Sequence, residues 1–281
     1  TDNNRKAYSI VFNSSGKMTS WTYDGKNLIA AGPDFNSYRK VDNDRNFSPS
    51  FSNSSSLSIT RALAKSGNNA TMSVEGSAMG CSYTINYTFY PDGTVDMNVK
   101  FSPSGTLARI GLGMQFASGF ENVEFYARGP RSNYSDRKTG SYLGRFTTTV
   151  DDMVDEMIHP QTFGDHEDMR ELILTNKASN VQIGIKAGGR ASFSLSHYDE
   201  TKWCKSGDSM WNTNLHWYDL TRYQQVYAHF DYMQRGLGNN SCGGDSCLSD
   251  YVCPSYSSWN SSYGYTLRFT PQSGGNARIT E

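Results

Sequence analysis

One short stretch of the 281-residue chain gathers many of the side chains that could do chemistry. It reads YARGPRSNYSDRKTG and covers residues 126–140. Its candidate residues are Arg128, Asn133, Tyr134, Asp136 and Arg137. A guanidinium group can bind a carboxylate or several carbonyls at once, and Asn, Tyr and Asp add donors and acceptors that suit sugar hydroxyls. Two interpretations are open: a sugar-binding patch, or ion pairs that brace long loops.

Bracing is the interpretation that we favour for this stretch. Charged groups stay buried only when they are paired and hydrogen-bonded. Asp136 is the one acidic residue within the stretch and lies next to Arg137, so an ionic cluster can form here and hold the loops of a sandwich together. Neither interpretation assigns a catalytic residue to the stretch.

Aromatic side chains mark a second candidate region at 202–220, which contains Trp203, Trp211 and Trp217. Exposed rings can stack on the faces of pyranose sugars, whereas buried rings fill a core. We expect Trp217 to pack in the core. Trp203 and Trp211 lie in a polar loop and are open to both interpretations.

We predict no metal site in this chain. The cysteines are Cys81, Cys204, Cys242, Cys247 and Cys253. Their spacing lacks the paired C-x2-C motifs of zinc sites, so free thiols or one local disulfide are expected, and the odd number leaves at least one thiol unpaired. The stretch VDND (41–44) lacks the register and the distal Glu of a calcium loop, which favours a turn. The five histidines form no H-x-x-x-H pair.

Composition excludes several classes of protein. The 26 Lys and Arg residues balance 27 Asp and Glu residues, which argues against a nucleic-acid partner. No apolar run approaches the ~20 residues that cross a bilayer. Aromatic residues make up 13% of the chain beside abundant Ser, Asn, Thr and Gly, a mixture that favours strands, turns and sugar-like ligands. Because the chain begins with Thr1 rather than Met, we expect it to be part of a longer protein.

Alternating hydrophobicity predicts the elements that position these residues. In SYTINYTFY (82–90) every second residue is apolar, PDG (91–93) supplies a turn, and TVDMNVKF (94–101) alternates again, so these segments predict a hairpin. Similar runs are VQIGIKA (181–187), ASFSLSH (191–197), VYAHFDY (226–232) and YGYTLRF (263–269). Helical periodicity is confined to a short helix at most within 215–225. We therefore predict an all-β antiparallel sandwich over residues 1–281 as one domain.

Five motifs then resemble, in the same order, the C-terminal domain of the large β-galactosidases of glycoside hydrolase family 2. They are GKMTSWTYDGKNLIAAGPDFNSYRKVDND (16–44), LARIGLGMQF (107–116), FYARGPRSNYSDRKTGSYLGRF (125–146), HPQTFGDHEDMREL (159–172) and HFDYMQRGLGNNSCG (229–243). In some members this domain is a separate small chain. The combination is specific, although each motif alone is weak. Ser132, where the family usually has Glu, and the shortened segment after residue 45 indicate a divergent member.

The resemblance implies a large antiparallel β-supersandwich like that of the galactose mutarotases. It also implies a parent β-galactosidase of the retaining type, whose two catalytic carboxylates, about 5 Å apart, lie on a (β/α)8 barrel. No segment here is similar to that barrel, so the isolated chain is expected to be inactive. The implied partners are the upstream barrel and β-sandwich domains and a carbohydrate, and a homo-oligomer stays open. The family often uses Mg or Na in the barrel, and a periplasmic or secreted location is favoured over the cytoplasm.

The resemblance also places one loop near the substrate. In the family, the matching loop carries an aromatic residue that stacks on the leaving-group sugar. The matching candidates here are Asn239, Asn240, Ser241 and Cys242. Because a thiol offers no ring face, contact with the aglycone would have to come from the Asn residues or from a displaced ring such as Tyr256 or Trp259.

Two other functions remain open from the sequence. The chain could be a stand-alone carbohydrate-binding module. It could also be a mutarotase-like epimerase, a reaction that needs a general acid and a general base beside the sugar ring. Glu167, Glu171, Glu200 and the histidines supply these residue types without a recognisable motif, so we rank the epimerase last.

Overall fold

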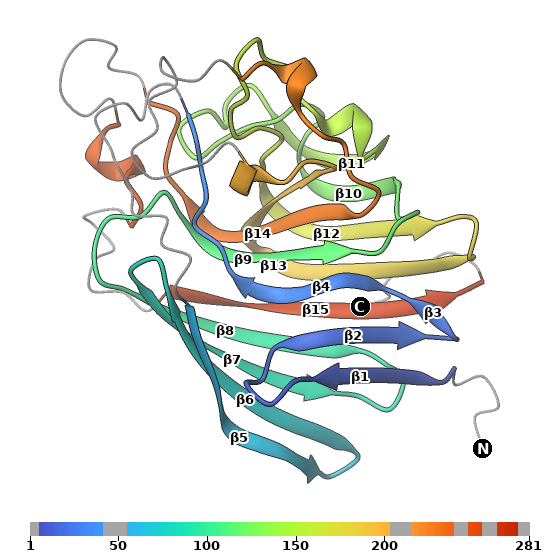
Figure 1. Ribbon diagram of the computed structural model, residues 1–281. Coiled ribbons are helices and arrows are strands. Elements are labelled where there is room, and N and C mark those ends of the chain that lie inside the picture. Colours follow the sequence, from blue (N-terminus) through green and yellow to red (C-terminus); the bar gives the residue numbers. More distant parts are fainter. Residues whose placement is uncertain (1–5, 42–54, 203–214, 239–246, 255–262, 275–281) are drawn as a thin grey trace.

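The computed structural model describes residues 6–41, 55–202, 215–238, 247–254 and 263–274, and nearly all of its regular structure is β-strand (Figure 1). The strands are β1 (Tyr8–Phe12), β2 (Met18–Tyr23), β3 (Lys26–Asn27), β4 (Ile29–Phe35), β5 (Ser55–Ser66), β6 (Asn69–Ala78), β7 (Cys81–Phe89), β8 (Val95–Pro103), β9 (Arg109–Phe116), β10 (Asn122–Gly129), β11 (Tyr142–Thr149), β12 (His166–Asn176), β13 (Val181–Ser196), β14 (Val226–Gln234) and β15 (Tyr263–Ser273). Short 3-10 turns are η2 (Asp151–Met153), η3 (Glu200–Lys202), η5 (Trp217–Asp219) and η6 (Ser249–Tyr251). The all-β prediction is confirmed.

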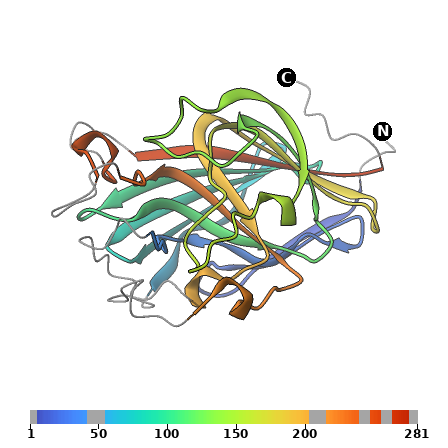
Figure 2. The same cartoon turned by 90° about the horizontal axis from the view of Figure 1, so that it is seen from above.

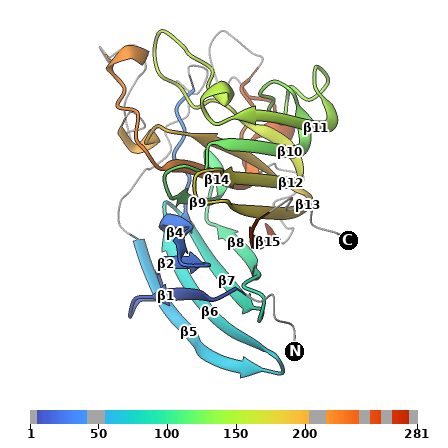
Figure 3. The same ribbon diagram turned by 90° about the vertical axis from the view of Figure 1, so that its right-hand side faces the viewer.

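The strands form a sandwich in which β13 belongs to both layers. One layer follows the order β11-β10-β12-β13-β15-β8-β7-β6-β5. The second half of β13 pairs with β14, which continues through β9 to β4, and every one of these pairings is antiparallel. Figure 2 shows β4 in blue and β15 in red on opposite sides of the sandwich, and Figure 3 shows β5–β7 curving away from β9 and β14.

The hairpin expected around residues 91–93 is present with the predicted register. Tyr87 lies opposite Met97 and Ile85 opposite Val99. The apolar residues of both strands are buried, because successive side chains of a strand point to opposite faces. The alternating pattern therefore determines both the pairing and the buried face.

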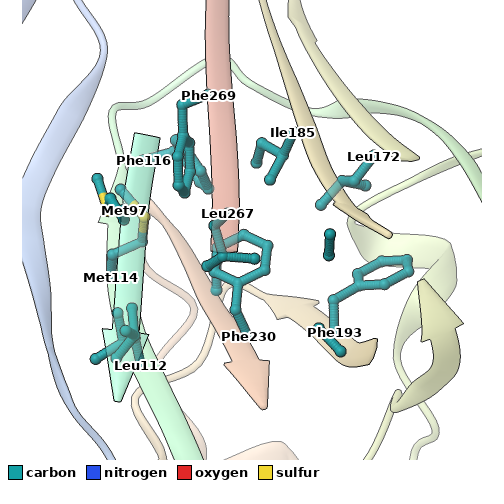
Figure 4. Close-up of a cluster of buried hydrophobic side chains, with 14 of the residues drawn as sticks. Met97, Leu112, Met114, Phe116, Leu172, Ile185, Phe193, Phe230, Leu267 and Phe269 are labelled. Carbon is teal, nitrogen blue, oxygen red and sulfur yellow. The ribbon is translucent and has the colours of Figure 1, made fainter. Parts of the chain in front are cut away.

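The core lies between the two layers as one contiguous cluster of buried side chains. Leu112, Met114 and Phe116 of β9 face Leu267 and Phe269 of β15 across the sandwich (Figure 4). Phe230 packs edge-on against Phe269, 5.9 Å between ring centroids. The contacts between β9 and β15 join strands that are more than 100 residues apart in the sequence. Together with Phe230 they fix which face of β9 and β14 points outward.

Some sequence predictions need refinement. The runs at 181–187 and 191–197 are parts of the single long strand β13, whose two halves pair with different neighbours. The helix considered within 215–225 is only the 3-10 turn η5. Cys81 and Cys253 carry free, buried thiols, and Cys247 is buried as well. No helix in the described part of the chain is long and apolar enough to cross a membrane. That residues 1–281 form one domain stays a prediction.

Candidate functional site

The outward face of β9 and β14 is polar, although the opposite face of both strands lies in the core. Along β14 the outward residues include His229 and Asp231, which lie opposite Gly113 and Gly111 of β9. A Cβ atom on Gly111 would lie 2.2 Å from Oδ1 of Asp231, so only glycine leaves room for that carboxylate. The G-L-G spacing of the 107–116 motif thus makes space for charged groups on this face.

Arg109 is the centre of a buried ionic network on this face. Its Nε lies 3.0 Å from Oδ2 of Asp231, and its Nη1 lies 3.2 Å from Oε2 of Glu200 in η3. The side chains of Arg109 and Asp231 have no exposed surface at all. Glu200 also lies 3.5 Å from Nε2 of His229. Such a network can persist because every charge has a partner of opposite sign.

Burial shifts the pKa values of the acidic members upward. Burial raises the pKa of Asp231 to about 6 and that of Glu200 to about 7, and the nearby charge of Arg109 only partly offsets it. Burial also raises the pKa of Asp165 well above its usual range. The pKa of His229 falls well below its usual value, because the ring is buried and lies close to Arg109. His229 is therefore neutral at pH 7.

A second arginine connects this network to the segment that follows β14. The buried Arg39 donates hydrogen bonds to the backbone carbonyls of Arg235 and Gly236, the latter at 2.7 Å. Both carbonyls precede residue 239, where the four loop candidates begin. Arg39, which follows β4, thus holds the segment before that loop from one side.

The 126–140 stretch holds the same segment from the other side. The carboxylate of Asp136 accepts the backbone N–H groups of Leu237, at 3.0 Å, and Gly238, at 2.9 Å. The Arg137 guanidinium pairs with Asp136 and donates to the carbonyl of Gly238. A side chain on Gly236 would lie 2.7 Å from the carboxyl carbon of Asp136, which accounts for the glycine there.

Asn133 and Tyr134 lie below the surface of the stretch. The Asn133 amide donates to the carbonyls of Arg128 and Arg131 and accepts the backbone N–H of Glu167. Asn133 is 2% exposed and Tyr134 is 6% exposed. Asn133 is therefore engaged with the protein itself, whereas Tyr134 is buried but lines the pocket beside the stretch.

Arg128 pairs with Asp168, not with Asp136. The ion pair joins Nε of Arg128 to Oδ2 of Asp168, and Lys138 bridges Asp168 and Glu167 at 3.1 and 2.9 Å. A register shift in β12 between His166 and Met169 lets these two carboxylates turn toward the stretch. Asp168 has a φ of 58°, a region that Asp tolerates better than most residues.

An open pocket lies beside these contacts. Its volume is about 350 Å³, and its lining includes Ser132, Tyr134, Arg137, Asp155, Gln161 and Leu237. Ser132 donates to Asp155 at 2.6 Å, and the Arg137 side chain is 46% exposed. The pocket therefore combines a cation, a carboxylate, a hydroxyl and an amide next to the start of the loop at 239.

The predicted site residues fall into two groups. Asp136 and Arg137 hold the segment 236–238, and Arg128 and Asn133 hold Asp168 and Glu167, which are contacts expected of a brace. Tyr134 lines the neighbouring pocket. That these five residues act as a brace stays a prediction. Asn239, Asn240, Ser241, Cys242, Trp203 and Trp211 lie outside the described residues, as do Tyr256 and Trp259. Among the described residues, no group of three or more His, Cys, Asp or Glu side chains could hold a metal ion.

Sequence reasoning missed the central part of the network. Arg109 and Asp231 lie within the motifs 107–116 and 229–243, but the sequence analysis assigned neither of them to a site. The available signal is a charged residue at a strand position flanked by apolar residues, as in L-A-R-I for Arg109 and H-F-D-Y for Asp231.

His197 and Trp217 lie away from this network. Both ring nitrogens of His197 have protein partners: Nε2 lies 2.6 Å from Glu121, and Nδ1 lies 3.0 Å from the Gln225 carbonyl. Trp217 packs against Phe163 and Tyr198 but is only partly buried, in a small cluster beside the main core, so the core position expected for it is not confirmed.

The fold has counterparts among solved structures. The chain has the sandwich fold of a galactose mutarotase-related enzyme from Lactobacillus acidophilus, with a TM-score of 0.50 at 8% sequence identity over 97% of this chain and 96% of that one. At this identity the likeness concerns the fold alone.

The sequence places the chain more narrowly. Residues 4–267 match the family described as the β-galactosidase small chain, and the chain belongs to that family. A β-galactosidase of Priestia megaterium is 28% identical over 71% of this chain and 18% of its own length. A second, from Bifidobacterium adolescentis, is 26% identical over 86% of this chain and 24% of its own length. The chain thus spans about a quarter or less of the relatives that it matches.

Proposed function

We propose that this chain is the supersandwich domain of a glycoside hydrolase that removes terminal β-D-galactosyl residues. In this proposal the catalytic carboxylates lie on a (β/α)8 barrel elsewhere in the parent protein, and this chain supplies none. The chain supports the barrel and shapes the side of the cleft that receives the aglycone. Family membership and the partial coverage of the β-galactosidase relatives support this assignment.

One observation carries the role in shaping the cleft. Asp136 holds the amides of Leu237 and Gly238 directly before the loop candidates. Hydrogen bonds to a carboxylate contribute more than neutral ones, about 1.5–3 kcal/mol each. With Arg39 and Arg137 holding the neighbouring carbonyls, the loop begins from a fixed position. A fixed start restricts where the side chains that follow can reach, as positioning of a sugar requires.

Hydrolysis of o-nitrophenyl β-D-galactoside tests the assignment. We expect the full-length gene product to hydrolyse this substrate and the isolated chain to be inactive. If the gene encodes only this chain, the barrel is a separate subunit, and mixing the two chains should restore activity. Hydrolysis by the isolated chain would contradict the proposal, and so would an inactive, folded full-length product.

A variant of the active protein tests the positioning role. Asp136→Ala in the full-length product should raise KM for lactose several-fold more than it lowers kcat, because the barrel carboxylates are untouched. Asp96→Ala is the matched control, since Asp96 forms its ion pair on the surface with Arg268. Equal kinetics for both variants would argue against a role of the brace in substrate positioning.

A further inference from the structure

A second cleft lies on the outward face of β4, β9 and β14. Its volume is about 160 Å³, and its lining includes Asp34, Asn36, Gln115, Tyr227 and His229. None of these residues lines the larger pocket beside Arg137. The two cavities are therefore separate.

The strand register creates this cleft. His229, Gly113 and Asp34 lie in one row across β14, β9 and β4. Because Gly113 has no side chain, the row has a gap between the imidazole and the carboxylate. The Asn36 amide fills part of this gap, since a Cβ atom on Gly113 would lie 2.7 Å from its Nδ2.

Hydrogen-bonding groups of several kinds face the cleft. Asp34 accepts from Lys17 at 3.3 Å, so its charge is already balanced. Asn36 accepts the backbone N–H of Tyr38 through Oδ1 at 2.9 Å, which orients its amide. Gln115 and Tyr227 lie opposite each other on β9 and β14 and add an amide and a phenol. Neutral donors and acceptors thus outnumber uncompensated charges.

His229 lines the cleft and can report what enters it. The residue is 7% exposed, and its Nδ1 is buried with no hydrogen-bond partner among the described residues. Its Nε2 faces Glu200 at 3.5 Å. Because Nδ1 has almost no accessible surface, a ligand in the cleft bonds to the groups beside the ring, and the imidazole senses the change in its surroundings.

We propose that this cleft binds one neutral polyhydroxy molecule of monosaccharide size, whose hydroxyls bond to the amides of Asn36 and Gln115 and the phenol of Tyr227. Amide and phenol groups together match hydroxyls that both donate and accept. The charges of the cleft favour neither an anion nor a cation, because Lys17 lines it together with Asp34 and Asp199. The identification of the ligand as a sugar rests on the proposed function, whereas the cleft and its hydrogen-bonding groups do not.

Histidine side-chain NMR of this chain, titrated with galactose, tests the proposal. We expect the ring nitrogens of His229 to shift along a saturating curve, with little change at His197, whose two ring nitrogens already have partners. Gln115→Ala and Tyr227→Phe should each raise the Kd at least threefold. Asn98→Ala, at a surface amide of β8, is the matched control and should leave the Kd unchanged.

The outcomes separate this proposal from the proposed function. An unmoved His229 at 100 mM galactose, or a Kd that is the same in both cleft variants and the control, would overturn the cleft proposal. Galactose binding at His229 in a chain whose full-length product fails to hydrolyse galactosides would uphold the cleft and overturn the proposed function. Hydrolysis of galactosides by the full-length product, without a shift at His229, would uphold the proposed function and overturn the cleft proposal.

Discussion

The two ends of the molecule differ in how deeply their ion pairs are buried. At the β5–β8 end, ion pairs such as Arg268 with Asp96 lie at the surface, and the Arg268 side chain is 48% exposed. On the outward face of β9 and β14, Arg109 and Asp231 are completely buried. The strands alternate similarly in both places. The difference is that η3 and the segments around Tyr38 and Asp165 cover the second face.

This contrast shows what the loops contribute. Where nothing covers a sheet, its polar face stays in water and its ion pairs add little, typically under about 1 kcal/mol. Where loops cover it, the same polar positions become buried charges that must be paired. The covered face is also where the chain holds the segment before residue 239 and forms the cleft at His229. Function is therefore expected on the covered face.

Removal of the central guanidinium should have the largest effect. Arg109→Ala leaves Asp231 and Glu200 buried without their cation, which typically costs about 3–5 kcal/mol. Urea unfolding of the chain measures this loss. A loss below about 1 kcal/mol would show that the covered face does not depend on its central ion pairs.

The pH dependence of Glu200 should be the next largest effect. The pKa of Glu200 is raised to about 7 in the folded chain, so the folded state binds more protons than the unfolded state between about pH 4.5 and 7. The stabilising contribution of the protonated group is thus lost as the pH rises through about 7. His229, with its lowered pKa, acts in the opposite direction below about pH 6.5, so a variant is needed to isolate Glu200.

Glu200→Gln supplies that comparison. The free energy of unfolding of the Gln variant minus that of the wild type should be larger at pH 8 than at pH 5. The change between the two pH values should approach about 3 kcal/mol, at roughly 1.4 kcal/mol per pH unit. Chemical unfolding at the two pH values measures it. A stability difference between the two proteins that does not change with pH would contradict the raised pKa.

Overpacking of the covered face should have an intermediate effect. Gly111→Ala places a Cβ atom 2.2 Å from Asp231 and 2.4 Å from the carbonyl of Phe230, and such insertions cost about 1–3 kcal/mol. Gly105→Ala is the control, because no atom lies within 4 Å of its added Cβ. Thermal unfolding should separate the two variants, and equal melting temperatures would contradict the tight contact.

The smallest effect is expected at the open end. Arg268→Ala removes an exposed pair with Asp96 and should cost less than about 1 kcal/mol. Raised salt should reduce even this loss, since surface pairs are screened. A loss as large as that of Arg109→Ala would remove the distinction between the two ends.

Local pattern in the sequence predicted much of the fold. The alternation around residues 91–93 predicts both strands and their register, because a one-residue slip would expose the whole apolar set. The full length of β13 was not predictable in this way. Its two halves alternate equally well, and only pairing with β14 or β15, distant in the sequence, distinguishes one long strand from two.

The site was predicted in part, for the same reason. The 126–140 stretch was recognisable locally, but its main contacts are with Asp168 and the amides of 237–238, which no local pattern reveals. Arg109 and Asp231 are 122 residues apart and meet only because β9 pairs with β14. The residues that the sequence did not predict are therefore those that long-range strand pairing brings together.

Hydrogen exchange at the backbone amides of Leu237 and Gly238 tests the central claim most directly. If Asp136 fixes the start of the loop, both amides should be protected in the wild type and exchange at least tenfold faster in Asp136→Ala. The amides of β14 should be unchanged, and Asp136→Asn, which keeps one acceptor, should lie between the two. Protection that is the same in all three proteins would contradict the account.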